Sequence, residues 1–169
     1  MQFLVRVHKV SRWLSDRRLT WLSYLIDTVI RIVYAARIPA AAEIHSTVHF
    51  SHNALAVVVT KESRIGPRSI IGTHVMLGSR WPLKGAPHIE EDVIVHTGAR
   101  VIGPVRIGRG SVIGANAVVL EDIPPFSLAV GVPAIIKKSG IQSCQYRPDS
   151  QAAEVALCNG LSAAESKSR

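Results

Sequence analysis

The middle of the sequence repeats an apolar residue every six positions, and this repeat restricts the fold more than any other feature. Glycine directly follows the apolar residue at positions 66, 72, 78, 108 and 114, and small or β-branched residues recur four places after it. A helix is excluded, because glycine recurs too often and six residues do not match a helical period. The apolar residues in one frame are Val59, Ile65, Ile71, Leu77, Ile89, Val95, Val101, Ile107, Ile113 and Val119.

A repeat of this kind predicts a coil of short parallel strands. Each hexapeptide would form one flat side of a triangular prism, so three hexapeptides make one coil and the apolar side chains stack inside. Glycine suits the tight corners, where positive φ or close backbone approach penalises a Cβ. Hydrophobic residues make up 47% of the 169 residues and aromatic residues only 5%, as expected for stacked aliphatic strands. The predicted fold class is therefore mainly β, a parallel β-helix.

The repeat is interrupted in two places. One segment does not follow the repeat's pattern of small residues: Gly78-Ser-Arg-Trp-Pro-Leu-Lys-Gly-Ala-Pro-His88. It is predicted to be a loop outside the prism, where binding residues often lie. Ile44 and Phe50 are six apart but out of frame with Val59. A slip of three residues therefore falls within 51–58, which includes His52.

The segments on either side of the repeat differ from it. Residues 137–169 are rich in Ser, Ala and Gln and are predicted to form a mostly disordered tail with a short helix near 150–159. We divide the chain into a helical segment (1–40), a β-helix domain (41–136) and this tail. Residues 1–40 predict two helices, separated by a break at 15–18 and ended by Pro39. Their apolar stripes are Phe3, Val7, Val10 and Leu14, then Leu19, Leu22, Ile26, Val29 and Val33.

The formal charge of +8 favours an anionic partner, such as nucleic acid, an anionic membrane surface or a phosphorylated ligand. Nucleic acid is the least favoured partner and is not expected, because the charge is spread and no aromatic residues interleave with it. No segment resembles a signal peptide, and the longest uncharged run near the N-terminus, residues 19–26, is shorter than the roughly 20 residues that cross a bilayer. A cytoplasmic protein is expected.

Three segments together resemble a known family. They are Phe50-Ser-His-Asn-Ala-Leu-Ala-Val-Val-Val59, Ile107-Gly-Arg-Gly-Ser-Val-Ile-Gly-Ala-Asn-Ala-Val-Val119 and Val130-Gly-Val-Pro-Ala134. From about residue 38 to 137 the chain resembles the hexapeptide-repeat acyltransferases, most closely the serine acetyltransferase-like branch. The resemblance implies a left-handed β-helix, a homotrimer with active sites between subunits, and transfer of acetyl from acetyl-CoA to an acceptor.

The resemblance implies that His52 is the catalytic general base. A hydroxyl is a poor nucleophile at neutral pH until a base removes its proton, and an imidazole, with an ordinary pKa of about 6.5, can accept that proton. The thioester oxygen becomes negative in the tetrahedral intermediate and needs hydrogen-bond donors. Ser79 matches the neighbourhood of the backbone amides that supply them in the family.

The resemblance also implies a cofactor-binding surface. Thr97 and Ala115 match positions that line the pantetheine arm of CoA, where small residues let a slim chain approach the backbone. Lys137 and Lys138 follow the closing segment and could meet the CoA phosphates as point charges, or could form an ordinary solvated basic tail. Acetyl-CoA is the expected donor, and no metal site is predicted.

Two departures from the family pattern leave the acceptor open. Serine acetyltransferases have an aspartate where this chain has Ser51, and an Arg-His-Pro stretch where it has Gly85-Ala-Pro-His88. Both L-serine and a sugar hydroxyl, on a precursor of surface polysaccharide, therefore remain candidates.

Other functions also stay open. The enzyme could use a different acyl donor or an amine acceptor, or the chain could be a non-catalytic β-helix scaffold. The basic N-terminal helices could contact an anionic membrane, with trimer packing as the alternative.

Overall fold

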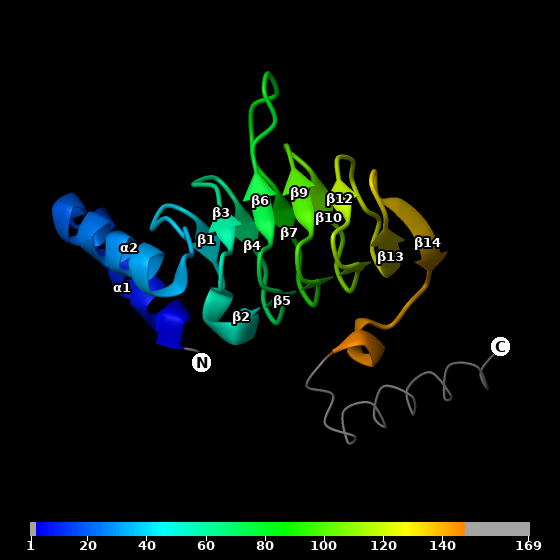
Figure 1. Ribbon diagram of the computed structural model, residues 1–169, viewed down its shortest axis with the longest axis horizontal. Coiled ribbons are helices and arrows are strands. Elements are labelled where there is room, and N and C mark those ends of the chain that lie inside the picture. Colours follow the sequence, from blue (N-terminus) through cyan, green and yellow to red (C-terminus); the bar gives the residue numbers. More distant parts are fainter. Residues whose placement is uncertain (1–2, 148–169) are drawn as a thin grey trace.

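Two helices precede a series of short strands in the computed structural model, which describes residues 3–147 (Figure 1). Helix α1 spans Phe3–Asp16 and helix α2 spans Thr20–Tyr34, so the predicted helical pair and the break between its members are confirmed. Helix α2 ends earlier than Pro39, because Ala35 adopts a left-handed conformation (φ 51°) that closes the helix. Neither helix is long and apolar enough to cross a membrane, and no other helix within 3–147 is.

The strands form three sheets, one on each side of a prism, and we name the sides A, B and C. Within residues 3–147 all strand pairs between coils are parallel, and only β13 and β14 pair antiparallel. The predicted parallel β-helix is therefore confirmed. Side A contains β3 (Val58–Val59), β6 (Met76–Gly78), β9 (Arg100–Ile102) and β12 (Val118–Val119); side B contains β1 (Glu43–Ile44), β4 (Arg64–Ile65), β7 (His88–Ile89) and β10 (Arg106–Ile107); side C contains β2 (His49–Phe50), β5 (Ile70–Ile71), β8 (Ile94–Val95), β11 (Val112–Ile113), β13 (Ser127–Val130) and β14 (Ile135–Ser139).

The six-residue repeat forms the core of the prism. On side B, for example, Ile65, Ile89 and Ile107 are direct partners in successive strands. Every one of the ten repeat residues is at most 2% exposed. Burial of an aliphatic side chain stabilises the fold by about 1.5–3 kcal/mol. Because the repeat residues are buried against those of the next coil, each coil is stabilised mainly by its neighbours.

Both interruptions of the repeat are additions at corners of the prism. Residues 79–87, between β6 and β7, form a loop that projects from the corner between sides A and B (Figure 1). The predicted loop is thus confirmed. The three-residue slip corresponds to a short 3-10 helix, η1 (Ser51–Ala54), at the corner between sides C and A. Insertions at corners leave the stacking of the sides undisturbed.

The C-terminal segment covers the outer face of side C. Strand β14 runs to Ser139, and a second 3-10 helix, η2 (Ser143–Tyr146), follows it. Ile141, just before η2, and Tyr146, its last residue, pack on a second apolar cluster, formed by the outward-facing residues Ile70, Ile94 and Val112. The prediction of a disordered tail from residue 137 is wrong for 137–147, because this outer face is apolar and requires a cover. The helix predicted near 150–159 lies outside the described residues.

Both helices pack against the first coil. Leu4, Val5 and Ile30 belong to the same core cluster as Ile38 of the first coil. His8 is buried, its Nε2 donates a hydrogen bond to the carbonyl of Pro39 at 3.1 Å, and its buried Nδ1 has no partner within residues 3–147. Burial lowers the pKa of His8, and the bond to Pro39 only partly opposes that effect. The ring is therefore held in its neutral form.

This burial predicts that docking of the helices weakens in acid. A histidine whose pKa is lowered by folding contributes full stability above its unfolded pKa of about 6.5, and this contribution is lost as the pH falls below that value toward the folded pKa. The wild type should lose more free energy of unfolding between about pH 7.5 and 5.5 than the variant His8→Leu, measured by chemical denaturation. The exposed His45 provides the control: His45→Leu should keep the wild-type pH slope. Equal slopes for the wild type and His8→Leu would contradict the prediction.

Candidate functional site

One edge of the prism, where side C meets side A, collects three of the predicted site residues. His52 lies in η1, between β2 and β3; Thr97 lies between β8 and β9; Ala115 lies between β11 and β12. The preceding strands are in register, so these residues occupy the same corner in different coils. We call this corner the C/A edge.

The C/A edge presents His52 on a strained turn. His52, Asn53 and Ala54 all have positive φ, at 47°, 55° and 60°, a conformation that costs about 1–2 kcal/mol for a residue with a Cβ. The turn is held by a hydrogen bond from the Leu55 amide to the His52 carbonyl and by one from the His74 amide to the Leu55 carbonyl, at 3.3 and 2.9 Å. Strained backbone that its surroundings maintain is common at functional sites.

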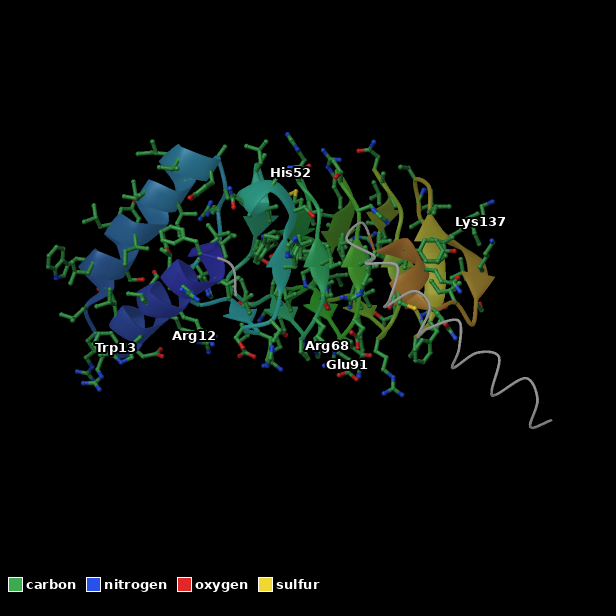
Figure 2. All side chains as sticks on the ribbon, turned by 90° about the horizontal axis from the view of Figure 1, so that it is seen from below. Arg12, Trp13, His52, Arg68, Glu91 and Lys137 are labelled. Atoms are coloured by element: carbon green, nitrogen blue, oxygen red, sulfur yellow. The ribbon has the colours of Figure 1, made fainter. Side chains whose placement is uncertain are left out.

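The His52 imidazole is exposed at this edge, on the turn that Figure 2 labels. Within residues 3–147 no hydrogen bond to its ring is found, so no side chain of the described chain orients it. A free imidazole nitrogen at the surface can accept a proton from an approaching hydroxyl.

Small residues continue the C/A edge from His52 toward the C-terminal end. The Thr73 hydroxyl donates to the Thr97 hydroxyl at 3.3 Å, and the Asn116 amide donates to the Thr97 carbonyl at 3.0 Å. Thr97 and Ala115 are exposed. A Cβ on Gly72 would lie 2.6 Å from the amide nitrogen of Thr97, so the coils approach each other closely here. The edge thus offers accessible backbone beside small side chains.

Two further histidines lie on this edge that the repeat and the family resemblance did not indicate as site residues. His74 is exposed at the corner between β5 and β6, and His96 is half-buried directly after β8. Burial lowers the pKa of His96. A signal for them was present, because His52, His74 and His96 are spaced by 22 residues, close to the coil lengths of 21 and 24 residues given by Phe50↔Ile71 and Ile71↔Val95.

The other predicted site residues lie elsewhere in the chain. Ser79 follows β6 at the corner between sides A and B, where it lines a cavity of about 390 Å³ with Arg37, Lys61 and Glu62. The loop after β6 and the turn after β2 lie at opposite margins of the prism (Figure 1). Within one chain, Ser79 is therefore separated from His52.

Lys137 and Lys138 are exposed in β14, which pairs with β13 at the C-terminal end of side C. Figure 2 shows Lys137 near the opposite end of the long axis from the helices, with His52 closer to the helical end. These cations could meet a ligand that extends from His52 along the prism. Within residues 3–147, no group of three or more His, Cys, Asp or Glu residues could hold a metal ion.

Comparison with known proteins shows what this chain resembles in sequence and fold. The family model described as bacterial transferase hexapeptide (six repeats) matches residues 86–121. The chain is 35% identical over 128 residues to the serine acetyltransferase of Bacillus subtilis, which covers 75% of this chain and 58% of that protein. It is also 35% identical over 128 residues to the serine acetyltransferase of Mycobacterium tuberculosis, covering 75% and 56%.

Solved structures agree. Soybean serine acetyltransferase complexed with serine has a TM-score of 0.74 at 35% identity, covering 79% of this chain and 55% of that one. A serine acetyltransferase in complex with CoA has a TM-score of 0.72 at 29% identity, covering 79% and 55%. The chain thus spans little more than half the length of these relatives. The chain is similar to serine acetyltransferases in sequence and fold and shares the hexapeptide repeat of the matched family model, so the predicted resemblance is confirmed.

The close approach of coils behind Thr97 predicts that Gly72→Ala destabilises the fold. The added Cβ would meet the backbone of Thr97, which cannot move without shifting a coil, so we expect a loss of about 1–3 kcal/mol in the free energy of unfolding. Gly78→Ala is the matched control, because its nearest neighbours are the tips of the Ile102 and Met76 side chains, at 3.1 and 3.2 Å. It should stay within about 1 kcal/mol of the wild type. Equal losses in denaturant unfolding would show that the coils are not tightly apposed at this edge.

Proposed function

We propose that this chain is an acetyl-CoA-dependent O-acetyltransferase and that His52 is its general base. The observation that carries the proposal is the placement of His52. It stands exposed on a strained turn at the start of an edge of small residues. The proposal is supported by the similarity to serine acetyltransferases, among them solved structures in complex with CoA and with serine.

The reaction needs one base that first accepts and later returns a proton. The acceptor hydroxyl gives its proton to the free nitrogen of His52 while its oxygen attacks the carbonyl carbon of the acetyl thioester. The tetrahedral intermediate then collapses, the carbon–sulfur bond breaks, and the CoA sulfur takes the proton from the imidazolium. The products are the acetyl ester and free CoA thiol, and His52 returns to its starting state.

The C/A edge would hold the donor in an extended conformation. Thr97 and Ala115 would line the pantetheine arm, because their small side chains leave the backbone accessible. Lys137 and Lys138, further toward the C-terminal end, would attract the phosphates. In this arrangement the thioester lies beside His52 and the charged end of CoA lies beside β14.

A homotrimer would complete the site. Ser79 is separated from His52 within one chain, so the loop 79–87 of a neighbouring subunit would have to bring it to the thioester. This requirement supports the trimer and gives Ser79 a role only in the assembly. A monomer in solution at working concentration, seen by sedimentation velocity, would argue against a Ser79 contribution.

The acceptor is L-serine or a sugar hydroxyl, and one observation favours the sugar. Neither η1 nor the C/A corner residues 72–75, 96–98 and 114–117 include an acidic residue, and Ser51 precedes His52. An amino-acid acceptor brings an ammonium group, which this edge has no carboxylate to pair with. A neutral hydroxyl, as in a surface-glycan precursor, needs no such partner.

Replacement of His52 should abolish most of the activity without unfolding the protein. We choose His52→Asn because asparagine tolerates the left-handed conformation of this turn. Release of free thiol from acetyl-CoA should fall at least ~100-fold, measured with L-serine and with nucleotide-linked and lipid-linked sugars as acceptors. The control is His45→Asn, at an exposed histidine whose ring contacts Thr47. An unchanged rate in His52→Asn would remove His52 from its role, and no turnover with any hydroxyl acceptor would favour the scaffold.

Bulk at Thr97 should weaken donor binding selectively. Thr97→Leu places a branched side chain where the pantetheine arm would lie, so KM for acetyl-CoA should rise about tenfold with kcat nearly unchanged, as for loss of uniform binding. Glu121→Leu, an exposed position at the corner between sides A and B, is the control and should leave KM unchanged. A fall in kcat with constant KM would place Thr97 near the reacting atoms instead.

A further inference from the structure

Helix α2 exposes an unusually apolar face. Six large residues on it are each between 51% and 77% exposed, although α2 is only 15 residues long. Soluble proteins rarely leave such a contiguous apolar patch open unless it binds something. We call this face the apolar strip; it comprises Trp21, Tyr24, Leu25, Val29, Ile32 and Val33.

The strip points away from the β-helix because the opposite face of α2 is anchored. Ile30 packs in the main core, and Ser23 is buried with its hydroxyl 2.9 Å from that of Ser11 in α1. Asp27 accepts a hydrogen bond from the Ser11 hydroxyl at 2.9 Å and one from the Ala40 amide at 3.4 Å. These contacts fix the rotation of α2, so the strip cannot turn inward.

Positive charge is concentrated at the same end of the molecule. Residues 3–37 contain seven arginines and lysines but two aspartates, which accounts for +5 of the total formal charge of +8. One of those aspartates, Asp27, is turned inward toward Ser11. Arg17 and Arg18 lie in the turn between the helices, and the Arg17 guanidinium stacks 5.1 Å from the ring of Trp13.

We propose that the helical end of this protein docks on the surface of an anionic lipid bilayer, with the apolar strip of α2 inserted at the interface. An amphipathic helix with aromatic and aliphatic residues on one face and arginines at its flanks binds such surfaces in this way. Tryptophan and tyrosine favour the headgroup level. Arg17 and Arg18, in the turn before α2, and Arg31, within α2, would attract the lipid phosphates.

A second copy of the chain is a less suitable occupant. Symmetric packing of two strips would bring two segments of the same positive charge together, and like charges across an interface are unfavourable. An anionic surface instead supplies the opposite charge over the whole area.

The place of the helices in the fold suits this docking. They lie at one end of the prism and the C-terminal strands lie at the other (Figure 1). If the prisms of the proposed trimer run in parallel, all three strips face the same way, and three weak contacts bind one surface together. This last step rests on the trimer; the docking of a single chain does not.

The proposal is tested by flotation of the full chain with vesicles. Vesicles of phosphatidylcholine with about one third phosphatidylglycerol should bind the protein, and pure phosphatidylcholine should bind it far less, since each arginine near the surface contributes about fivefold. The double variant Leu25→Glu/Ile32→Glu should bind anionic vesicles at least about tenfold more weakly. The control is Leu83→Glu/Val132→Glu, whose parent residues are exposed to a similar degree but lie outside the helices; it should bind like the wild type.

Two further measurements decide the remaining outcomes. In a variant that keeps only Trp21, made by Trp13→Phe/Trp81→Phe, the fluorescence should shift to the blue and be quenched by brominated lipid in anionic vesicles. Without vesicles, sedimentation velocity should give the same mass for the wild type and for the double variant Leu25→Glu/Ile32→Glu. The proposal is overturned by absence of vesicle binding, by equal binding to neutral vesicles, by equal loss in the control variant, or by a changed mass of the strip variant, which would assign the strip to a second copy.

Discussion

The structure depends on the vertical contact between aliphatic side chains one coil apart. The three sides of the prism are built from strands that range from two to five residues, too short to be stable alone. Their stability comes from burial of the repeat residue against its partners above and below, as in other repeat architectures. Such a stack cannot stop by itself, because its last coil leaves an apolar layer open. Helices α1 and α2 cover one end here, β14 follows the last coil at the other end (Figure 1), and η2 lies over the outer face of side C.

This rigidity explains how the chain can maintain an unfavourable turn at His52. Three successive residues with positive φ would not persist in a free loop, but this turn connects β2 and β3, two strands that are fixed by the core. The free energy gained by stacking the coils therefore offsets the conformational cost of this turn. The same coils align the C/A corners, so that the small residues beyond His52 form one continuous edge.

The sequence predicts the periodic part of this structure well because one contact type repeats. The frame of Ile65, Ile89 and Ile107 determined the sides, and the slip before Val59 correctly indicated an irregular corner. The distribution of residues over the corners was harder to predict, since it depends on counting three corners through coils of unequal length. Ser79 illustrates this, because its motif position gave no sign that it lies on a different edge from His52. The prediction of disorder from residue 137 is wrong for 137–147, because the polar composition of 137–169 outweighs the few apolar residues that pack on side C.

The cover on side C has a practical consequence for anyone who shortens this chain. The outer face of side C is apolar, and Ile141 and Tyr146 cover its residues Ile70, Ile94 and Val112. Arg147 holds the end of this cover in place, because it donates hydrogen bonds to the Arg68 carbonyl and to Asp92. A truncation placed at the last repeat would uncover a hydrophobic ladder along a regular β surface. Expression boundaries for this protein therefore belong after Arg147, beyond the point at which the hexapeptide pattern ends.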